Sequence, residues 1–166
     1  MAHPDLATRK AKRSTGRPDA PGPGLRVLLT TGASDAHTWN LVHLQLFLEE
    51  AGHSVLNLGP CVPERLLVDT VELTRPDLIV FSSVNGHGHL DGLRAAHALD
   101  ANPLTRGIPK VIGGRLGITA GEGEAERRTA LLAAGFDEVH PDGAGPEPLL
   151  GRLAALAGAA DARLAA

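Results

Sequence analysis

The sequence predicts an α/β domain built on a doubly wound, five-stranded parallel sheet with the strand order 2-1-3-4-5. From residue 25 onward, short apolar runs alternate with segments in which apolar residues recur at helical spacing. The strand-like runs are apolar on both faces, which is typical of parallel strands covered by helices on two sides. The chain has 166 residues, of which 43% are hydrophobic, and this is enough for the core of one domain.

The five predicted strands are short runs rich in Leu, Val, Ile and Phe, in chain order residues 25–31, 54–58, 77–83, 110–113 and 136–139. Gly59 and Pro60 end the second strand, and Pro109 precedes the fourth. Proline cannot donate to a strand ladder and glycine weakens a strand interior, so both residues mark strand boundaries. Strands that alternate with helices favour a parallel sheet of the flavodoxin-like kind.

The five predicted helices follow the strands one by one, at residues 41–51, 63–73, 90–99, 124–134 and 146–156. Gly52 and Gly135 follow the first and fourth helices, where glycine takes the left-handed C-cap conformation at little cost. Pro63 stands in the first turn of the second helix, where the N–H that it lacks is not needed.

Composition divides the chain into three parts. Residues 1–24 carry five Lys and Arg among Pro, Gly and Ser. No periodicity or aromatic residue accompanies this charge, so we expect a flexible tail rather than a nucleic-acid-binding arm. Residues 25–158 form the predicted domain, and residues 159–166 an Ala-rich end.

Charge and cysteine content exclude several classes of protein. The formal net charge is -3, so the body of the chain lacks the basic surface of a nucleic-acid-binding protein. Cys61 is the single cysteine, which rules out a disulfide framework and a cysteine-rich zinc site. No apolar run approaches the roughly 20 residues of a membrane span, and residues 1–24 lack the apolar core of a signal peptide. We therefore expect a cytoplasmic protein with no membrane partner.

Unusual residues gather on three loops of the predicted sheet, those after Thr31, Ser83 and Gly113. In doubly wound sheets, ligands bind beyond the carboxyl ends of the strands, at the switch point between strands one and three. The three loops carry hydroxyl, carboxylate, imidazole and glycine residues. Their convergence predicts a binding site at this edge of the sheet.

The residue types on these loops suit a bound metal or base. Asp35 stands two residues before His37 and can accept a hydrogen bond from one ring nitrogen, leaving the other free and more basic. Gly113 and Gly114 let a flat group lie against the backbone, because no Cβ holds it off. Ser82 can hydrogen-bond a ligand. The Asp-His pair and the two glycines, each taken alone, are more typical of an ordinary surface loop, and a serine at a strand end is also common there, but their joint occurrence favours a site.

Three motifs resemble those of the B12-binding domain family, Asp-x-His-x-x-Gly, Ser-x-Leu and Gly-Gly. They correspond to Asp35-Ala36-His37 after residues 31–34, to residues 82–88, and to residues 112–114. The resemblance extends from about Leu25 to the last helix. Within the family the chain is most similar to the small, cobalamin-binding sigma subunits of glutamate (methylaspartate) mutases, which residues 57–59 and 142–147 also resemble.

The resemblance implies a role for each matching residue. His37 would replace the dimethylbenzimidazole of cobalamin as the lower axial ligand of cobalt, the base-off, His-on state, with Asp35 holding its other ring nitrogen. The displaced nucleotide tail would enter a slot contacted by Ser82 and lined by Val84. The implied cofactor-binding residues are Ser34, Asp35, Ala36, His37, Thr38, Trp39, Asn40, Ser82, Val84, Asn85, Gly86, Gly113, Gly114, Arg115 and Gly117.

Three residues depart from the family pattern. Val84 stands in place of leucine and keeps an apolar wall. Asn40 stands in place of the motif glycine, which takes backbone angles and close approaches that most residues cannot. Asparagine is among the better substitutes at positive φ. Trp39 adds a bulky group beside it.

The function implied by the resemblance is that of the cofactor-binding subunit of an adenosylcobalamin-dependent isomerase that converts L-glutamate to 3-methylaspartate. An (α/β)8 barrel takes about 250 residues, so the substrate site would lie on a separate, larger barrel subunit, and this chain would be inactive alone. A dimer of small subunits is a further expectation. Two alternatives remain: a corrinoid methyl carrier, although residues 1–24 are too short for its helical bundle, and a B12-sensing module with an output domain.

The remaining histidines divide into two groups. His87 and His89 lie on a predicted loop at the site, where they would contact the corrin, a partner, a substrate or solvent. A zinc site formed with His37 is an open alternative for them. His43 on a helix and His140 at a strand end are expected to have no direct role.

Overall fold

The computed structural model describes residues 24–118, 121 and 123–164. Within this part of the chain, strands and helices alternate from β1 to α5. The strands are β1 (Arg26–Thr30), β2 (Ser54–Asn57), β3 (Leu78–Ser83), β4 (Lys110–Gly114) and β5 (Glu138–His140). The helices are α1 (Trp39–Glu50), α2 (Glu64–Thr74), α3 (Gly88–Ala101), α4 (Glu124–Ala133) and α5 (Glu147–Leu164).

The strands form one parallel sheet in the order β2-β1-β3-β4-β5, which confirms the predicted topology. From β1 the chain passes to β2 on one side, and it then crosses to β3 on the other side of β1, so the switch point lies between β1 and β3. The register of β3 and β4 pairs Ser82 with Gly113 and Ser83 with Gly114. The predicted site residues on these two strands are therefore neighbours at the carboxyl edge.

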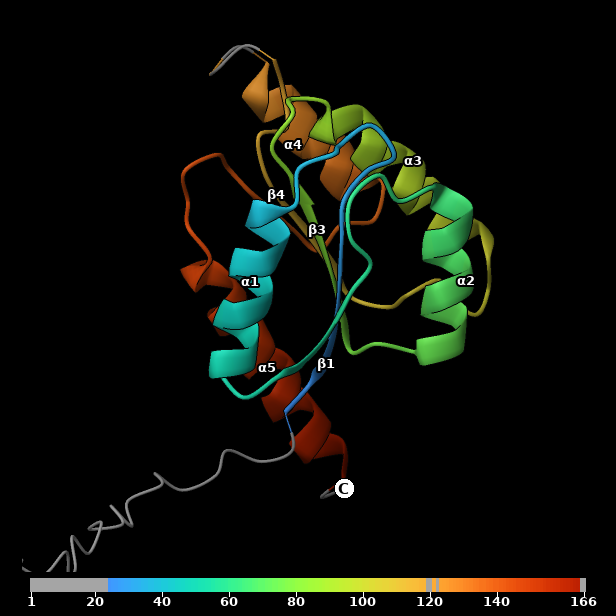
Figure 1. Ribbon diagram of the computed structural model, residues 1–166. Coiled ribbons are helices and arrows are strands. Elements are labelled where there is room, and N and C mark those ends of the chain that lie inside the picture. The colour runs from blue at the N-terminus through green and yellow to red at the C-terminus, as the bar shows by residue number, and fades with distance from the viewer. Residues whose placement is uncertain (1–23, 119–120, 122, 165–166) are drawn as a thin grey trace, which may run out of the picture.

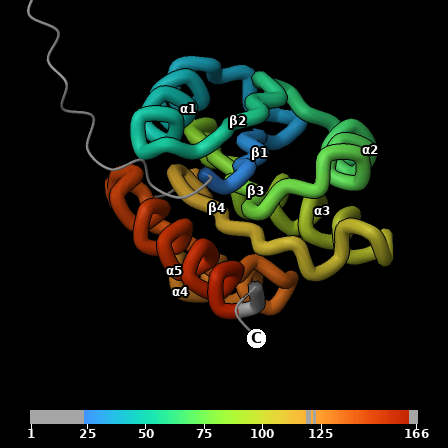
Figure 2. The backbone as a smooth tube through the Cα atoms, turned by 90° about the horizontal axis from the view of Figure 1, so that it is seen from below, coloured from blue at the N-terminus to red at the C-terminus, as the bar shows by residue number. Residues whose placement is uncertain are grey.

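Helices cover both faces of the sheet, as Figures 1 and 2 show. Helices α1 and α5 pack on one face, where Leu41 and Leu149 join a core cluster with Val80. Helices α2, α3 and α4 pack on the other face, where the cluster includes Phe81. Alternate residues of β3 thus point to opposite layers, as the period of a strand requires. Because both layers are apolar, β3 is buried along its whole length.

Several helix boundaries differ from those predicted, and three of the differences bear on the site or are large. Helix α1 begins at Trp39, two residues early, and the Thr38 carbonyl accepts the Val42 amide at 3.0 Å. Helix α3 begins at Gly88, so His89 lies in its first turn and not in a loop. Helix α5 continues to Leu164 instead of ending at residue 156, because alanine has the highest helix propensity and residues 157–160 contain no breaking proline. The predicted tail, residues 1–23, lies outside the described residues.

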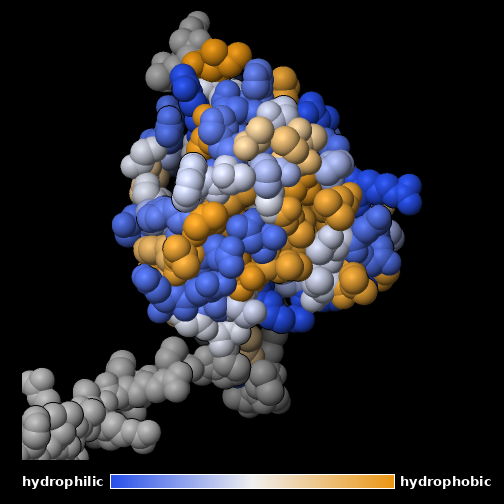
Figure 3. Space-filling view, viewed as in Figure 1, coloured by the Kyte–Doolittle hydropathy of each residue, from blue (hydrophilic) through white to orange (hydrophobic). Residues whose placement is uncertain are grey.

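Helix α1 is apolar on its outer side as well as on its inner side. Trp39, Val42 and Leu46 recur at helical spacing and are 83%, 41% and 54% exposed. Leu56 on β2 and Leu66 on α2 are exposed too, and hydrophobic surface is visible on this side of the molecule in Figure 3. Among the helices of the described residues, none is long and apolar enough to cross a membrane.

Candidate functional site

The loop after β1 presents an imidazole at the carboxyl edge of the sheet. His37 lies between β1 and α1, and its side chain is 60% exposed. Its Nδ1 lies 2.7 Å from Oδ1 of Asp35, whose carboxylate is only 1% exposed. The buried carboxylate accepts a hydrogen bond from Nδ1–H and so fixes the ring tautomer, with Nε2 as the unprotonated nitrogen. In the described residues nothing forms a hydrogen bond with Nε2, so its lone pair is available to a ligand.

Asp35 also joins the loop after β1 to the loop after β3. Its Oδ2 accepts the backbone N–H of Val84 at 2.8 Å and of Asn85 at 3.3 Å, while Oδ1 accepts the His37 N–H at 3.1 Å. Burial by itself would raise the pKa of Asp35, but the hydrogen bonds from Val84, from the His37 ring and amide and from Asn85 together lower the pKa. The carboxylate is therefore ionised and holds the imidazole in one orientation.

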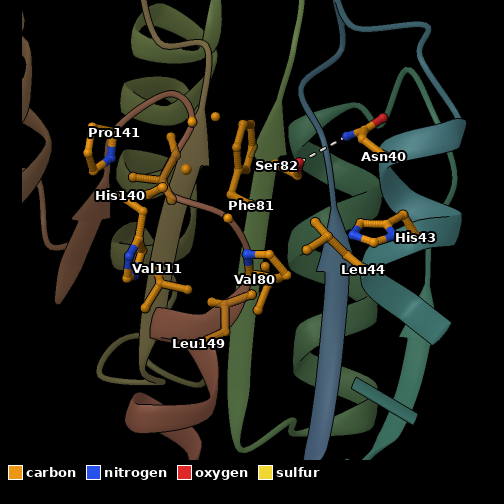
Figure 4. A pocket seen from close by; sticks show the side chains of 17 residues that line it. Asn40, His43, Leu44, Val80, Phe81, Ser82, Val111, His140, Pro141 and Leu149 are labelled. Atoms are coloured by element: carbon orange, nitrogen blue, oxygen red, sulfur yellow. Dashed lines mark hydrogen bonds between the residues drawn. The ribbon is translucent and has the colours of Figure 1, made fainter. Parts of the chain in front are cut away.

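A cavity of about 250 Å³ opens beside this loop, between α1 and α5 above β3 and β4 (Figure 4). Its walls are mostly apolar and include Leu44, Val80, Val111 and Leu149. The strand period turns Ser82 and Gly113 toward the same layer as Val80 and Val111, so both reach this cavity. The glycine-rich turn after β5, residues 143–145, closes one side.

Two glycines at the end of β4 leave room that a side chain would fill. A Cβ on Gly113 would lie 3.1 Å from Cβ of His140. Gly114 has φ +92°, and a Cβ there would lie 2.1 Å from the carbonyl oxygen of Ser83. The close pairing of β4 with β3 therefore requires glycine at residue 114. Both glycines line the cavity.

Asn40 closes the opposite side of the cavity. It lies in the first turn of α1, and its Nδ2 donates to Oγ of Ser82 at 2.9 Å (Figure 4). In the described part of the chain, Cys61 and Arg75 are the non-glycine residues with positive φ, so Asn40 does not adopt a glycine-like conformation. The asparagine is helical and adds a polar side chain that a glycine would lack.

Other predicted residues take different positions around the edge. Thr38 precedes α1, and Ala36 and Thr38 are exposed. Val84 is half-buried and contributes its amide to Asp35. Arg115 and Gly117 line a separate cavity of about 450 Å³ between β4 and α4. Gly86 lies on a third cavity, with His87 and His89. The predicted residues that line a cavity are thus spread over three adjoining cavities, and the loop that carries His37 lies outside all three linings.

The residues of the three loops fall within one match to a known protein family. The model of the B12 binding domain matches residues 25–138, which include β1 and β4 and all three loops. The chain belongs to the B12-binding domain family. The matched range includes His37, Ser82, Gly113 and Gly114, the imidazole, serine and glycines at this edge of the sheet.

Relatives agree with this assignment, and a solved structure shares the fold. A glutamate mutase sigma subunit of Treponema denticola is 30% identical over 119 residues, covering 72% of this chain and 84% of the relative. Glutamate mutase sigma subunit 2 of Haloarcula marismortui is 30% identical over 129 residues, covering 78% and 85%. A crystal structure of a cobalamin-binding protein from Desulfitobacterium hafniense matches the fold with a TM-score of 0.61 and 23% identity, covering 78% of this chain and 59% of that protein.

Sequence reasoning did not predict that two histidines of the B12-binding domain line this cavity. His43 on α1 and His140 at the end of β5 both line the cavity between α1 and α5. His140 is the last residue of β5, and the register of β5 with β4 places it opposite Gly113, which the sequence alone does not give. The sequence could not assign His43 to the cavity, because a position on a helix does not indicate which cavity the helix lines.

The predicted alternative of a zinc site is not supported. Within the described residues, no group of three or more His, Cys, Asp or Glu side chains could hold a metal ion. His89 lies in α3, and burial together with the charge of Arg127 lowers its pKa. Its Nδ1 is buried with no hydrogen-bond partner among those residues. His37, His87 and His89 therefore do not form one ligand set.

Proposed function

We propose that this chain is the cobalamin-binding subunit of an adenosylcobalamin-dependent carbon-skeleton mutase. In this proposal Nε2 of His37 would bind the cobalt of cobalamin, and the cavity between α1 and α5 would hold the displaced nucleotide tail. The carrying observation is the buried, ionised Asp35 hydrogen-bonded to an exposed His37 at the edge that also holds this cavity. A neutral imidazole with one nitrogen held and the other free is the form that binds a metal.

The residues present fit this cofactor. The cavity offers apolar walls for a flat base and a hydroxyl, that of Ser82, for a polar group. Gly113 leaves open the space that a side chain would occupy beside His140. When bound, adenosylcobalamin would supply the radical chemistry of carbon-skeleton rearrangement. The chain itself binds and orients the cofactor, and Asp35 keeps the proton of His37 on Nδ1.

The proposed reaction is the interconversion of L-glutamate and 3-methylaspartate, because the relatives at 30% identity are glutamate mutase sigma subunits. The described residues contain one open sheet. We therefore place the substrate on a separate (α/β)8-barrel chain, and we expect this chain to be inactive without it. The exposed apolar stripe of Trp39, Val42 and Leu46, which begins two residues after His37, leaves surface for such a partner.

The ligation is tested with the purified chain and cobalamin. The wild type should show the absorption change of base-off, histidine-ligated cobalamin, and cobalt(II) samples made with ¹⁵N-labelled histidine should show hyperfine coupling to the imidazole nitrogen. His37→Ala should lose both signals. His97→Ala changes an exposed histidine on α3 and should keep both. Identical cobalamin binding by wild type and His37→Ala, with the benzimidazole still ligated, would refute the proposal.

The reaction is tested with the partner. The barrel-sized protein that co-purifies with the chain should convert glutamate only when the chain and adenosylcobalamin are added. Turnover supported by methylcobalamin and a methyl acceptor would instead identify a methyl carrier.

A further inference from the structure

A second buried carboxylate contacts the loop that carries His37. Asp91 lies in the first turn of α3, and it is 3% exposed. Its Oδ2 accepts a hydrogen bond from the Ser34 hydroxyl at 2.5 Å. On its other side, Asp91 accepts a hydrogen bond from Arg94, which also donates to Glu64 of α2 at 3.0 Å. Asp91 therefore connects the loop after β1 to two helices of the α2, α3 and α4 layer.

The loop approaches Asp91 unusually closely. A Cβ on Gly32 would lie 2.1 Å from Oδ2 of Asp91 and 2.5 Å from its Cβ. Only glycine at residue 32 leaves space for this approach. The contact thus depends on two features far apart in the sequence, a glycine at the start of the loop and a carboxylate on α3.

Hydrogen bonds continue from Ser34 to His37. Nδ2 of Asn85 donates to the Ser34 carbonyl oxygen at 2.8 Å and to its Oγ at 3.1 Å. The backbone N–H of Asn85 donates to Oδ2 of Asp35, and Oδ1 of Asp35 holds the His37 ring. The polar groups from Asp91 to His37 form one connected chain, Asp91, Ser34, Asn85, Asp35 and His37.

We propose that Asp91 is a positioning residue for His37, acting through Ser34 and Asn85. The negative charge of Asp91 is needed because it accepts from Ser34 on one oxygen and from Arg94 on the other. An asparagine would have to turn its amide N–H toward one of these donors, so one hydrogen bond would be lost. The Arg94 side chain is 53% exposed, so its ion pair with Asp91 contributes little net stability, which leaves room for a role in geometry. The positioning role of Asp91 is independent of the proposed function, and only the identity of the ligand that His37 binds rests on that proposal.

The first test uses the whole chain without cobalamin. Amide hydrogen exchange reports the bonds that Val84, Asn85 and His37 donate to Asp35. In Asp91→Asn these amides should exchange about tenfold faster than in the wild type, the effect of losing one hydrogen bond to a charged group. The Ile79 amide, bonded to Pro109 in the core, should change much less.

Matched variants separate positioning from general stability. Ser34→Ala alters an exposed loop residue and should speed the same amides, while the double variant with Asp91→Asn should add little, because both break one chain of bonds. Asp69→Asn removes an exposed carboxylate on α2 and should leave these amides unchanged. Equal acceleration of loop and core amides, or fully additive effects of the two variants, would overturn the proposal.

The second test adds cobalamin. Asp91→Asn should weaken histidine-ligated binding by about tenfold for the loss of one charged hydrogen bond, whereas Asp69→Asn should bind as the wild type does. If the wild type fails to ligate cobalamin through His37, the proposed function fails, while the exchange measurement still decides whether Asp91 positions the loop. Unchanged ligation in an Asp91→Asn variant whose loop amides also exchange normally would refute the positioning role.

Discussion

Two adjacent glycines at the end of β4 should respond differently to an added methyl group: one substitution should lower stability, and the other should mainly weaken cobalamin binding. Gly114 has φ +92°, and a Cβ there would lie 2.1 Å from the Ser83 carbonyl oxygen. Gly113 has no positive φ, and its Cβ would lie 3.1 Å from the His140 Cβ, which requires a shift of only a few tenths of an ångström. Gly114→Ala therefore strains the backbone, and Gly113→Ala mainly fills the cavity.

The expected free energies follow from these contacts. An alanine in the left-handed region costs about 1–2 kcal/mol, and forcing a methyl group against a backbone costs about 1–3 kcal/mol. Gly114→Ala should thus lower the free energy of unfolding by about 2–5 kcal/mol, a large part of the roughly 5–15 kcal/mol of a typical domain. Gly113→Ala should change it by about 1 kcal/mol or less, because alanine suits a strand better than glycine does.

Urea unfolding followed by circular dichroism measures the first effect, and cobalamin titration measures the second. Gly114→Ala should shift the unfolding midpoint strongly. Gly113→Ala should unfold nearly as the wild type does but bind cobalamin more weakly, because its methyl group enters the cavity. The reasoning is refuted if Gly114→Ala unfolds at the wild-type midpoint, or if Gly113→Ala is the less stable of the two.

Two further changes test the packing around the site and the pH dependence. Asn40→Gly should lower the free energy of unfolding by about 1–2 kcal/mol, because it removes the hydrogen bond to Ser82 and puts glycine in a helix. Urea unfolding measures this change. An unchanged free energy of unfolding would show that the Asn40–Ser82 hydrogen bond contributes nothing to stability. Burial lowers the pKa of His53, and the neutral Nδ1 of this residue accepts a hydrogen bond from the Leu25 amide. The stability that the neutral His53 contributes is therefore complete above its ordinary pKa of 6.5 and is lost as the pH falls below that value. The decline in stability between about pH 7 and 5, measured by urea unfolding, should be shallower in His53→Gln, and equal slopes would contradict this assignment.

The sequence pattern was sufficient for the fold because each element has a local cause. The apolar centre of β3 and the capping glycine at residue 52 indicate their elements without any tertiary information. Helix ends were less certain, since Gly88 and the alanines after residue 156 are compatible with either helix or loop. The B12-binding motifs also indicated which loops matter, and the Asp35–His37 hydrogen bond follows from their spacing.

Distances between elements were decided only by the tertiary structure. Nothing in the sequence places Asp91 on α3 against Ser34, or Asn40 on α1 against Ser82, because both pairs are formed by packing segments more than forty positions apart. The same holds for His140, which reaches the cavity through the register of β5 with β4. Local chemistry therefore determined what the loop after β1 contains, and helix packing on the sheet determined what holds it in place.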